Sequence, residues 1–173
     1  MKKLIFGLLI VTFLYLCGCG HYSFYNRSNP HLKTVMIEEF FNNTEEYELP
    51  STITTYLTEN FILDNRLKVM ADEADMKVCG IILSYSKTVF SYDVHENPKE
   101  WQIIINFSID VKDITKNTNL WQNKNLSLNA IYGNPENESQ SYSDIENMTE
   151  EDAQHEIIND LCDIILSNSV EQW

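Results

Sequence analysis

The sequence predicts a single α/β domain, a two-layer sandwich with two helices packed on one face of a mainly antiparallel sheet of four to five strands. Two segments alternate apolar and polar residues, which is the pattern of strands that bury one face, and a long apolar stretch precedes them. Two other segments repeat apolar residues at helical spacing. With 173 residues, 43% of them hydrophobic, the chain is long enough for one domain with a core and too short for two.

The clearest strand is expected from Trp101 to Asp113, where alternate residues are apolar and the residues between them are mostly polar. The apolar stretch Met76–Tyr92 precedes it, and Leu120–Tyr132 alternates again after a polar turn, so these three strands are expected to form a meander. Shorter strands are predicted at Thr34–Phe40, followed by a turn, and at Arg66–Met70. The predicted order is therefore β-α-β-β-β-β-α.

Helices are expected in two places. Pro50 suits the first turn of a helix whose apolar stripe follows it. That stripe consists of Ile53, Tyr56, Leu57 and Phe61. A second helix begins at Thr149, which forms with Asp152 a pattern similar to a capping box. Its buried face is formed by the pairs Ile157/Ile158, Leu161/Cys162 and Ile164/Ile165. The polar, acidic segment 133–147 before it is expected to be an exposed loop or a partly disordered linker.

The chain is strongly acidic, with a formal net charge of −14. Without Lys2 and Lys3 it has 10 Lys and Arg against 26 Asp and Glu, a charge of −16. From Asn125 to Trp173 there are 11 acidic residues and no Lys or Arg. Such a surface repels the phosphates of nucleic acids and anionic lipid head groups. Nucleic-acid binding is therefore excluded, and a soluble, well-hydrated surface is expected.

The first 18 residues predict a cleaved signal peptide. Lys2 and Lys3 form a basic start, an apolar run extends from Leu4 to Leu16, and Cys17 and Gly18 form a short exit. The run has 13 residues, and at about 1.5 Å each it spans about 20 Å. A hydrocarbon core is about 30 Å thick, so the run is too short for a permanent transmembrane helix.

The residues around Cys19 resemble a bacterial lipobox, with an aliphatic residue, Leu16, at −3 and the small residues Cys17 and Gly18 before the cysteine. At such a site the chain is cleaved between Gly18 and Cys19. The Cys19 thiol receives a diacylglycerol and the freed amino group an acyl chain, and no other cofactor is expected. Cys17 cannot take this role because the bulky Tyr15 and Leu16 precede it. The alternative is an ordinary secretory signal followed by a buried or disulfide-bonded cysteine.

Residues 19–32 are expected to form a lipidated tether and residues 33–173 the domain. Gly20 follows Cys19, and the lack of Asp at this position resembles lipoproteins that are sorted to the outer membrane. A tether of about 13 residues reaches about 20 Å on average and about 45 Å when fully extended. We therefore expect a domain held close to the periplasmic face of the outer membrane.

Residues that catalysis or metal binding would require are not grouped in the sequence. Gly80 and Gly133 are the only glycines in the domain, which excludes a Gly-rich phosphate loop. There is no Gly-x-Ser-x-Gly elbow, and the histidines lack cysteines at ligand spacing. These histidines are His21, His31, His95 and His155. We predict no metal and no catalytic residue.

Cys79 and Cys162 are the cysteines that remain once Cys19 is modified. If the last helix packs on the strand of Cys79, an oxidising periplasm would permit a disulfide worth about 2–4 kcal/mol. The alternative interpretation is that both are small buried hydrophobic side chains.

Several segments resemble, in the same order, the LptE family of lipopolysaccharide-assembly lipoproteins. Cys19–Phe24 resembles the Cys-Gly-Tyr-x-Phe start of this family, with His21 inserted, and His31–Thr44 is similar to its first strand and turn. The similarity continues in four later segments: Asp64–Val69, Ala74–Asp75, Gly80–Ser86 and Leu120–Trp121. The acidic segment 134–147 does not map onto the family.

This resemblance implies a structural, non-enzymatic role. The domain would sit inside or beneath the lumen of an LptD β-barrel, support its assembly and help to pass lipopolysaccharide to the outer leaflet. Direct lipopolysaccharide contact, which the family also implies, would need Lys or Arg near lipid A. The candidates are scattered lysines: Lys77, Lys87, Lys112 and Lys124, and also Lys99 and Lys116. We expect the plugging role rather than direct lipid binding.

An alternative is an envelope-assembly or activator lipoprotein with a domain similar to TolB N-terminal, LpoB or CsgG domains. These domains share a strand followed by a Phe-x-Asn-x-Thr/Ser turn. Activators that must reach the cell wall usually carry a long Pro- or Ala-rich linker, whereas this chain has about 13 residues there. The tether length therefore favours the hypothesis of an LptE-like lipoprotein.

Overall fold

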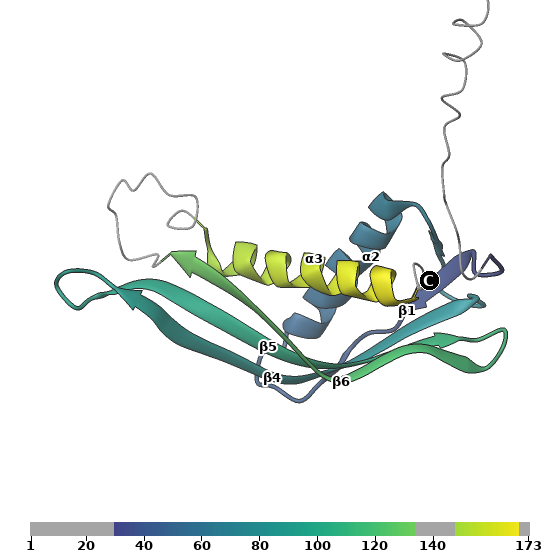
Figure 1. Ribbon diagram of the computed structural model, residues 1–173, viewed down its shortest axis with the longest axis horizontal. Coiled ribbons are helices and arrows are strands. Elements are labelled where there is room, and N and C mark those ends of the chain that lie inside the picture. Colours follow the sequence, from purple (N-terminus) through teal and green to yellow (C-terminus); the bar gives the residue numbers. More distant parts are fainter. Residues whose placement is uncertain (1–29, 134–147, 170–173) are drawn as a thin grey trace, which may run out of the picture.

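The structure, a computed structural model, describes residues 30–133 and 148–169. Two helices form one layer and a mixed six-stranded sheet forms the other (Figure 1). The elements are β1 (Thr34–Ile37), β2 (Phe41–Asn42), α2 (Leu49–Asp64), β3 (Lys68–Val69), β4 (Met76–Tyr92), β5 (Pro98–Asp113), β6 (Thr118–Gly133) and α3 (Glu150–Ser169). The predicted two-layer α/β sandwich is confirmed, with six strands in place of four to five.

The sheet has the strand order β3-β1-β4-β5-β6, and β2 also pairs with β4. The long strands β4, β5 and β6 pair antiparallel and form the expected meander. The short strands β1, β2 and β3 join it through parallel pairs. The extra strand arises where a turn was predicted, because Phe41 and Asn42 pair with Ile81 and Ile82 of β4.

The core lies between the sheet and the two helices. On β5, five alternate side chains are completely buried, as the sequence pattern predicts. They are Ile103, Ile105, Phe107, Ile109 and Val111. In α2 the stripe residues Ile53, Leu57 and Phe61 are buried, and Tyr56 packs partly buried against the same core. The helix α3 packs over β6 and β5 and against α2 (Figure 1).

The capping box at the start of α3 is confirmed. The backbone N–H and the hydroxyl of Thr149 donate to Asp152 Oδ2, at 2.9 and 2.7 Å. In return the backbone N–H of Asp152 donates to Thr149 Oγ1 at 3.2 Å. These bonds satisfy backbone donors that a helix start would otherwise leave unpaired.

A β-bulge in β4 changes which side chains face the helices. The register shifts between Ile82 and Ser84, so the alternation of inward and outward side chains is reset. After the bulge Tyr85 and Lys87 pair with the buried residues Ile105 and Ile103, and therefore lie on the helix side of the sheet. A lysine thus reaches the inner face of a strand.

The predicted signal peptide, Cys19, most of the tether and the acidic segment 134–147 lie outside the described residues. The end of the predicted tether, residues 30–32, is described by the structure. Leu32 is 2% exposed and belongs to the core, so the chain enters the domain before residue 33. Among the residues that the structure describes, no helix is long and apolar enough to cross a membrane.

Candidate functional site

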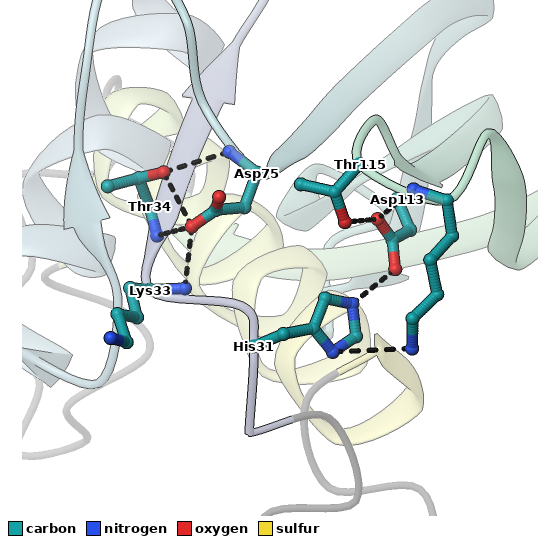
Figure 2. A network of polar contacts seen from close by, with 7 residues as sticks. His31, Lys33, Thr34, Asp75, Asp113 and Thr115 are labelled. Carbon is teal, nitrogen blue, oxygen red and sulfur yellow. Dashed lines mark hydrogen bonds and ion pairs between the residues drawn. The ribbon is translucent and has the colours of Figure 1, made fainter.

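A network of polar contacts holds the N-terminal segment to the end of the sheet (Figure 2). We call it the N-terminal clamp, and it consists of His31, Lys33, Thr34, Asp75, Asp113, Thr115 and Lys116. It joins three parts of the chain that are distant in sequence: the entry segment, the loop before β4 and the turn between β5 and β6. The clamp therefore fixes where the chain leaves the domain toward Cys19.

Asp113 is the buried centre of the clamp, with its side chain 1% exposed. Its Oδ2 lies 2.5 Å from His31 Nε2, and its Oδ1 accepts the Thr115 hydroxyl at 2.6 Å and the Lys116 backbone N–H at 3.0 Å. Burial opposes ionisation, but the hydrogen bonds from Thr115, His31 and Lys116 outweigh it and lower the pKa of Asp113 to about 2.

The contacts of His31 indicate its tautomer. Lys116 Nζ lies 3.3 Å from His31 Nδ1. An ammonium group can only donate, so Nδ1 accepts while Nε2–H donates to the Asp113 carboxylate. The His31 ring therefore bridges Lys116 and Asp113.

Asp75 binds Lys33 and Thr34, which follow His31 in the entry segment. Its Oδ2 accepts the backbone N–H groups of Lys33 and Thr34 at 2.9 and 3.0 Å and the Thr34 hydroxyl at 2.9 Å. The Asp75 N–H donates back to Thr34 Oγ1 at 2.8 Å. The hydrogen bond from Lys33 contributes most to lowering the pKa of Asp75, followed by that from the Thr34 hydroxyl.

We expect Asp113→Asn to lower the free energy of unfolding at neutral pH by about 1–3 kcal/mol, because His31, Thr115 and the Lys116 backbone N–H lose a buried, charged acceptor. The pKa of Asp113 is lower in the folded protein than its unfolded value of about 3.9, so its stabilisation is complete above about pH 4 and is lost toward pH 2. Urea unfolding between pH 2 and 7 measures this loss of stability.

The control for Asp113→Asn is Asp110→Asn, on the same strand but half-buried and bonded to Gln122. Equal pH dependence in wild type and Asp113→Asn would contradict the prediction.

A second polar cluster fastens the start of α3 to the inner face of the sheet. The carboxylate of Glu150 accepts hydrogen bonds from Lys87 Nζ at 2.5 Å, from the Tyr85 hydroxyl at 2.7 Å and from the Tyr132 hydroxyl at 3.3 Å. The ammonium of Lys87 also lies 5.4 Å from the ring centres of Trp101 and Tyr132. Burial raises the pKa of Glu150, but the bonds from Lys87 and Tyr85 lower it overall. No periodic pattern indicates this cluster, because the β-bulge places Tyr85 and Lys87 on the inner face.

The four preferred lipopolysaccharide-contact lysines do not lie together. Lys87 is bound by Glu150 on the helix side, and Lys77 forms an ion pair with Glu38. Lys112 lies opposite Lys77 on the neighbouring strand, and Lys112 and Lys124 are both exposed. Two of the four positive charges are therefore already balanced by carboxylates within the domain.

Cys79 and Cys162 are free thiols, so the structure does not contain the disulfide that the sequence left open. The side chain of Cys79 donates to Glu38 Oε2 at 3.1 Å. Cys79 follows the buried Val78 on β4, so its side chain lies on the face of the sheet away from the helices. Cys162 is 3% exposed and packs in the core beneath α3. The sheet separates the two thiols, and the prediction of a buried cysteine holds for Cys162 alone.

Two further surfaces of the domain differ in chemistry, an apolar hairpin and an acidic cleft. The hairpin between β4 and β5 extends beyond α3 (Figure 1) and exposes Phe90, Tyr92 and Val94, the last to 92%. Beside the starts of α2 and α3, an open cleft of about 640 Å³ contains five glutamates in its lining. They are Glu45, Glu46, Glu48, Glu150 and Glu151. Within the described parts of the chain, no group of three or more His, Cys, Asp or Glu residues could hold a metal ion.

Comparison with protein families identifies the domain. The family model LptE, described as lipopolysaccharide-assembly, matches residues 32–169, which include nearly all of the described domain. The chain belongs to the LptE family. The match begins at the buried Leu32 and ends at the last residue of α3, so the family and the fold define the same unit. No curated protein sequence matches this LptE-family chain.

Solved structures share the fold of this LptE-family chain at low sequence identity. The hypothetical protein CT253 from Chlamydia trachomatis is 14% identical, with a TM-score of 0.58 over 82% of this chain and 99% of that chain. A PelC dodecamer from Paraburkholderia phytofirmans is 9% identical, with a TM-score of 0.51 over 81% and 89%. An uncharacterized lipoprotein B from Nitrosomonas europaea is 16% identical, with a TM-score of 0.48 over 78% and 80%. The first two show the fold alone.

Proposed function

We propose that this protein is an outer-membrane lipoprotein, lipidated at Cys19, that supports the assembly and plugging of an LptD-like β-barrel in lipopolysaccharide transport. Membership of the LptE family over residues 32–169 carries the proposal. The lipobox pattern that ends at Cys19 agrees with it, because two or three acyl chains on one residue anchor a protein stably. The domain then works on the periplasmic side, close to the membrane.

The shape and chemistry of the domain suit a structural partner of a barrel. Both helices cover the same face of the sheet, and no described segment covers the other (Figure 1). The central part of that outer face carries uncharged polar side chains, such as Ser84, Asn106, Ser108, Ser127 and Asn129. The interior of an outer-membrane barrel is polar as well, so this central part can meet it without burying charge.

Direct lipopolysaccharide binding has weaker support. It would need several cations near the phosphates of lipid A, and Lys77 and Lys87 are held by Glu38 and Glu150. Lys112 and Lys124 are exposed, and they remain our candidates for any such contact. The plugging role needs no cluster of cations.

Detergent co-purification of the tagged lipoprotein tests the proposal. We expect a large β-barrel of the LptD type to be recovered with it. Recovery of a different envelope complex without that barrel would contradict the proposal and favour an activator of the TolB N-terminal, LpoB or CsgG-like type. Mass spectrometry of the eluted proteins distinguishes the two outcomes.

We expect Phe90→Ser, Tyr92→Ser and Val94→Ser together to lower recovery of the barrel by about tenfold or more. These side chains are exposed apolar groups on a hairpin that extends past the helices, and loss of such anchors costs about 1.4 kcal/mol or more. The matched control is Ile62→Ser with Leu63→Ser, two apolar side chains of α2 that are exposed to 58% and 80%. Equal loss in both variants would show that general hydrophobicity, rather than the hairpin, determines recovery.

A further inference from the structure

The turn between β5 and β6 is held beside the entry of the N-terminal segment. His31 contacts Asp113 and Lys116 (Figure 2). The backbone N–H of Ile114 donates to the Asp75 carbonyl at 2.8 Å. These contacts connect the turn to the chain on both sides of its tip. The position of the turn relative to the start of the domain is therefore fixed.

The length of chain before the clamp keeps this turn near the lipid. His31 follows Cys19 by twelve positions, and at about 3.3–3.6 Å per residue this stretch spans at most about 40 Å. The opposite hairpin, around Val94, lies at the far end of β5, which has 16 residues and a length of about 50 Å. Of the two hairpin tips, the β5–β6 turn is therefore the one nearer to the residue from which the chain leads to Cys19.

The chemistry of the turn fits a phospholipid surface. Ile114 is 49% exposed, and the exposed Lys112 and Lys116 flank it in sequence. The acid among them, Asp113, is buried and bonded within the clamp, so it presents no free carboxylate to the surface. An apolar side chain between lysines suits the boundary of a bilayer, where the apolar group enters and the ammonium groups meet phosphates.

The remaining charges favour the same orientation. Lys33 is exposed at the entry segment, and Asp72 and Glu73 are exposed in the loop before β4, so this end of the domain is close to neutral. The opposite hairpin exposes Glu96 and carries the half-buried Asp93, and the glutamate-lined cleft lies beside the starts of the helices. An anionic leaflet repels that acidic part more strongly than the clamp end.

We propose that the turn Lys112–Lys116 is a membrane-contact element, in which Ile114 enters the head-group boundary of the phospholipid leaflet that holds the Cys19 acyl chains. Lys112 and Lys116 bind lipid phosphates beside it. This inference rests on the proposed lipidation of Cys19. It gives the tethered domain one defined end toward the membrane and leaves the outer sheet face and the Phe90–Val94 hairpin free for a protein partner.

The test uses the full mature lipidated chain in vesicles of phosphatidylethanolamine and phosphatidylglycerol. In a Cys79→Ser and Cys162→Ala background, an environment-sensitive fluorophore is attached at Ile114→Cys or, as the matched control, at Val94→Cys. Both positions are exposed on hairpin tips, so labelling disturbs no core packing. We expect bromine-labelled lipids to quench the fluorophore at position 114 several-fold more than that at position 94. Lys112→Glu with Lys116→Glu is expected to reduce quenching at position 114.

Each result decides between the proposals. Quenching at position 94 that equals or exceeds quenching at 114, or no quenching at either in protein that sediments with the vesicles, would overturn the membrane-contact turn and leave the lipid anchor intact. Protein that carries no acyl chain and does not sediment with vesicles would overturn the anchor, and the inference with it. Unchanged quenching in the Lys112→Glu, Lys116→Glu variant would overturn the phosphate contacts.

Discussion

Cys19→Ser is expected to abolish lipid attachment and to leave the protein as an uncleaved precursor. The proposed anchor is a thioether, which a serine hydroxyl cannot form. Incorporation of an alkyne-tagged fatty acid measures the lipid, and slower gel migration measures the retained residues 1–18. This effect is the largest that we predict, because all acyl chains are attached to one residue, and with them nearly all of the membrane affinity.

The neighbouring cysteine provides the matched control. Cys17 lies two residues earlier, before the predicted cleavage point between Gly18 and Cys19. Cys17→Ser keeps a small residue there, so acylation and cleavage are expected to proceed as in the wild type. Fatty-acid label that persists in Cys19→Ser, or that disappears in Cys17→Ser, would contradict the assignment.

Gly80→Ala is expected to destabilise the domain by about 1–3 kcal/mol through overpacking. A Cβ at this position would overlap Cε1 and Cδ1 of the Phe40 ring. Phe40 is 2% exposed and packs edge-on against Phe107, with ring centres 6.4 Å apart, so its ring cannot move away freely. Gly80 has no positive φ, and the expected loss is therefore steric rather than a backbone effect. Urea unfolding followed by circular dichroism measures it.

A double-mutant cycle tests the steric explanation. Phe40→Leu removes ring atoms that the new methyl group would meet, so the double variant Gly80→Ala, Phe40→Leu is expected to lose less stability than the sum of the two single changes. Strict additivity of the three unfolding free energies would show that the two positions are not coupled. The contact of Gly80 with Phe40 would then not explain the glycine.

Local patterns in the sequence predicted the long elements of the fold. The segment with strict alternation, Trp101 to Asp113, forms most of β5, since a strand buries all of its apolar side chains on one covered face. The capping residues Thr149 and Asp152 marked the helix start because they bond to each other's backbone over three residues. Such signals are complete within a few neighbouring residues, and a sequence displays them directly.

Strand β2 and the clamp were not predictable in the same way. β2 is two residues long and exists because Phe41 and Asn42 meet β4 some forty residues later. His31 was assigned to the tether, and its partner Asp113 lies 82 residues away. Neither contact leaves a periodic pattern, because each depends on where the meander places a distant residue.

By itself, the sequence determined the sandwich class, the order of the long strands and helices, and the pattern ending at Cys19 that predicts the anchor. Only the tertiary structure decided which charges remain free. The bulge near Leu83 turned Lys87 inward to Glu150, and the sheet placed Cys79 on the face opposite the helices. The physical reason is that one extra residue in a strand exchanges its two faces, whereas hydrophobic periodicity gives no measure of a register set by pairing with another strand.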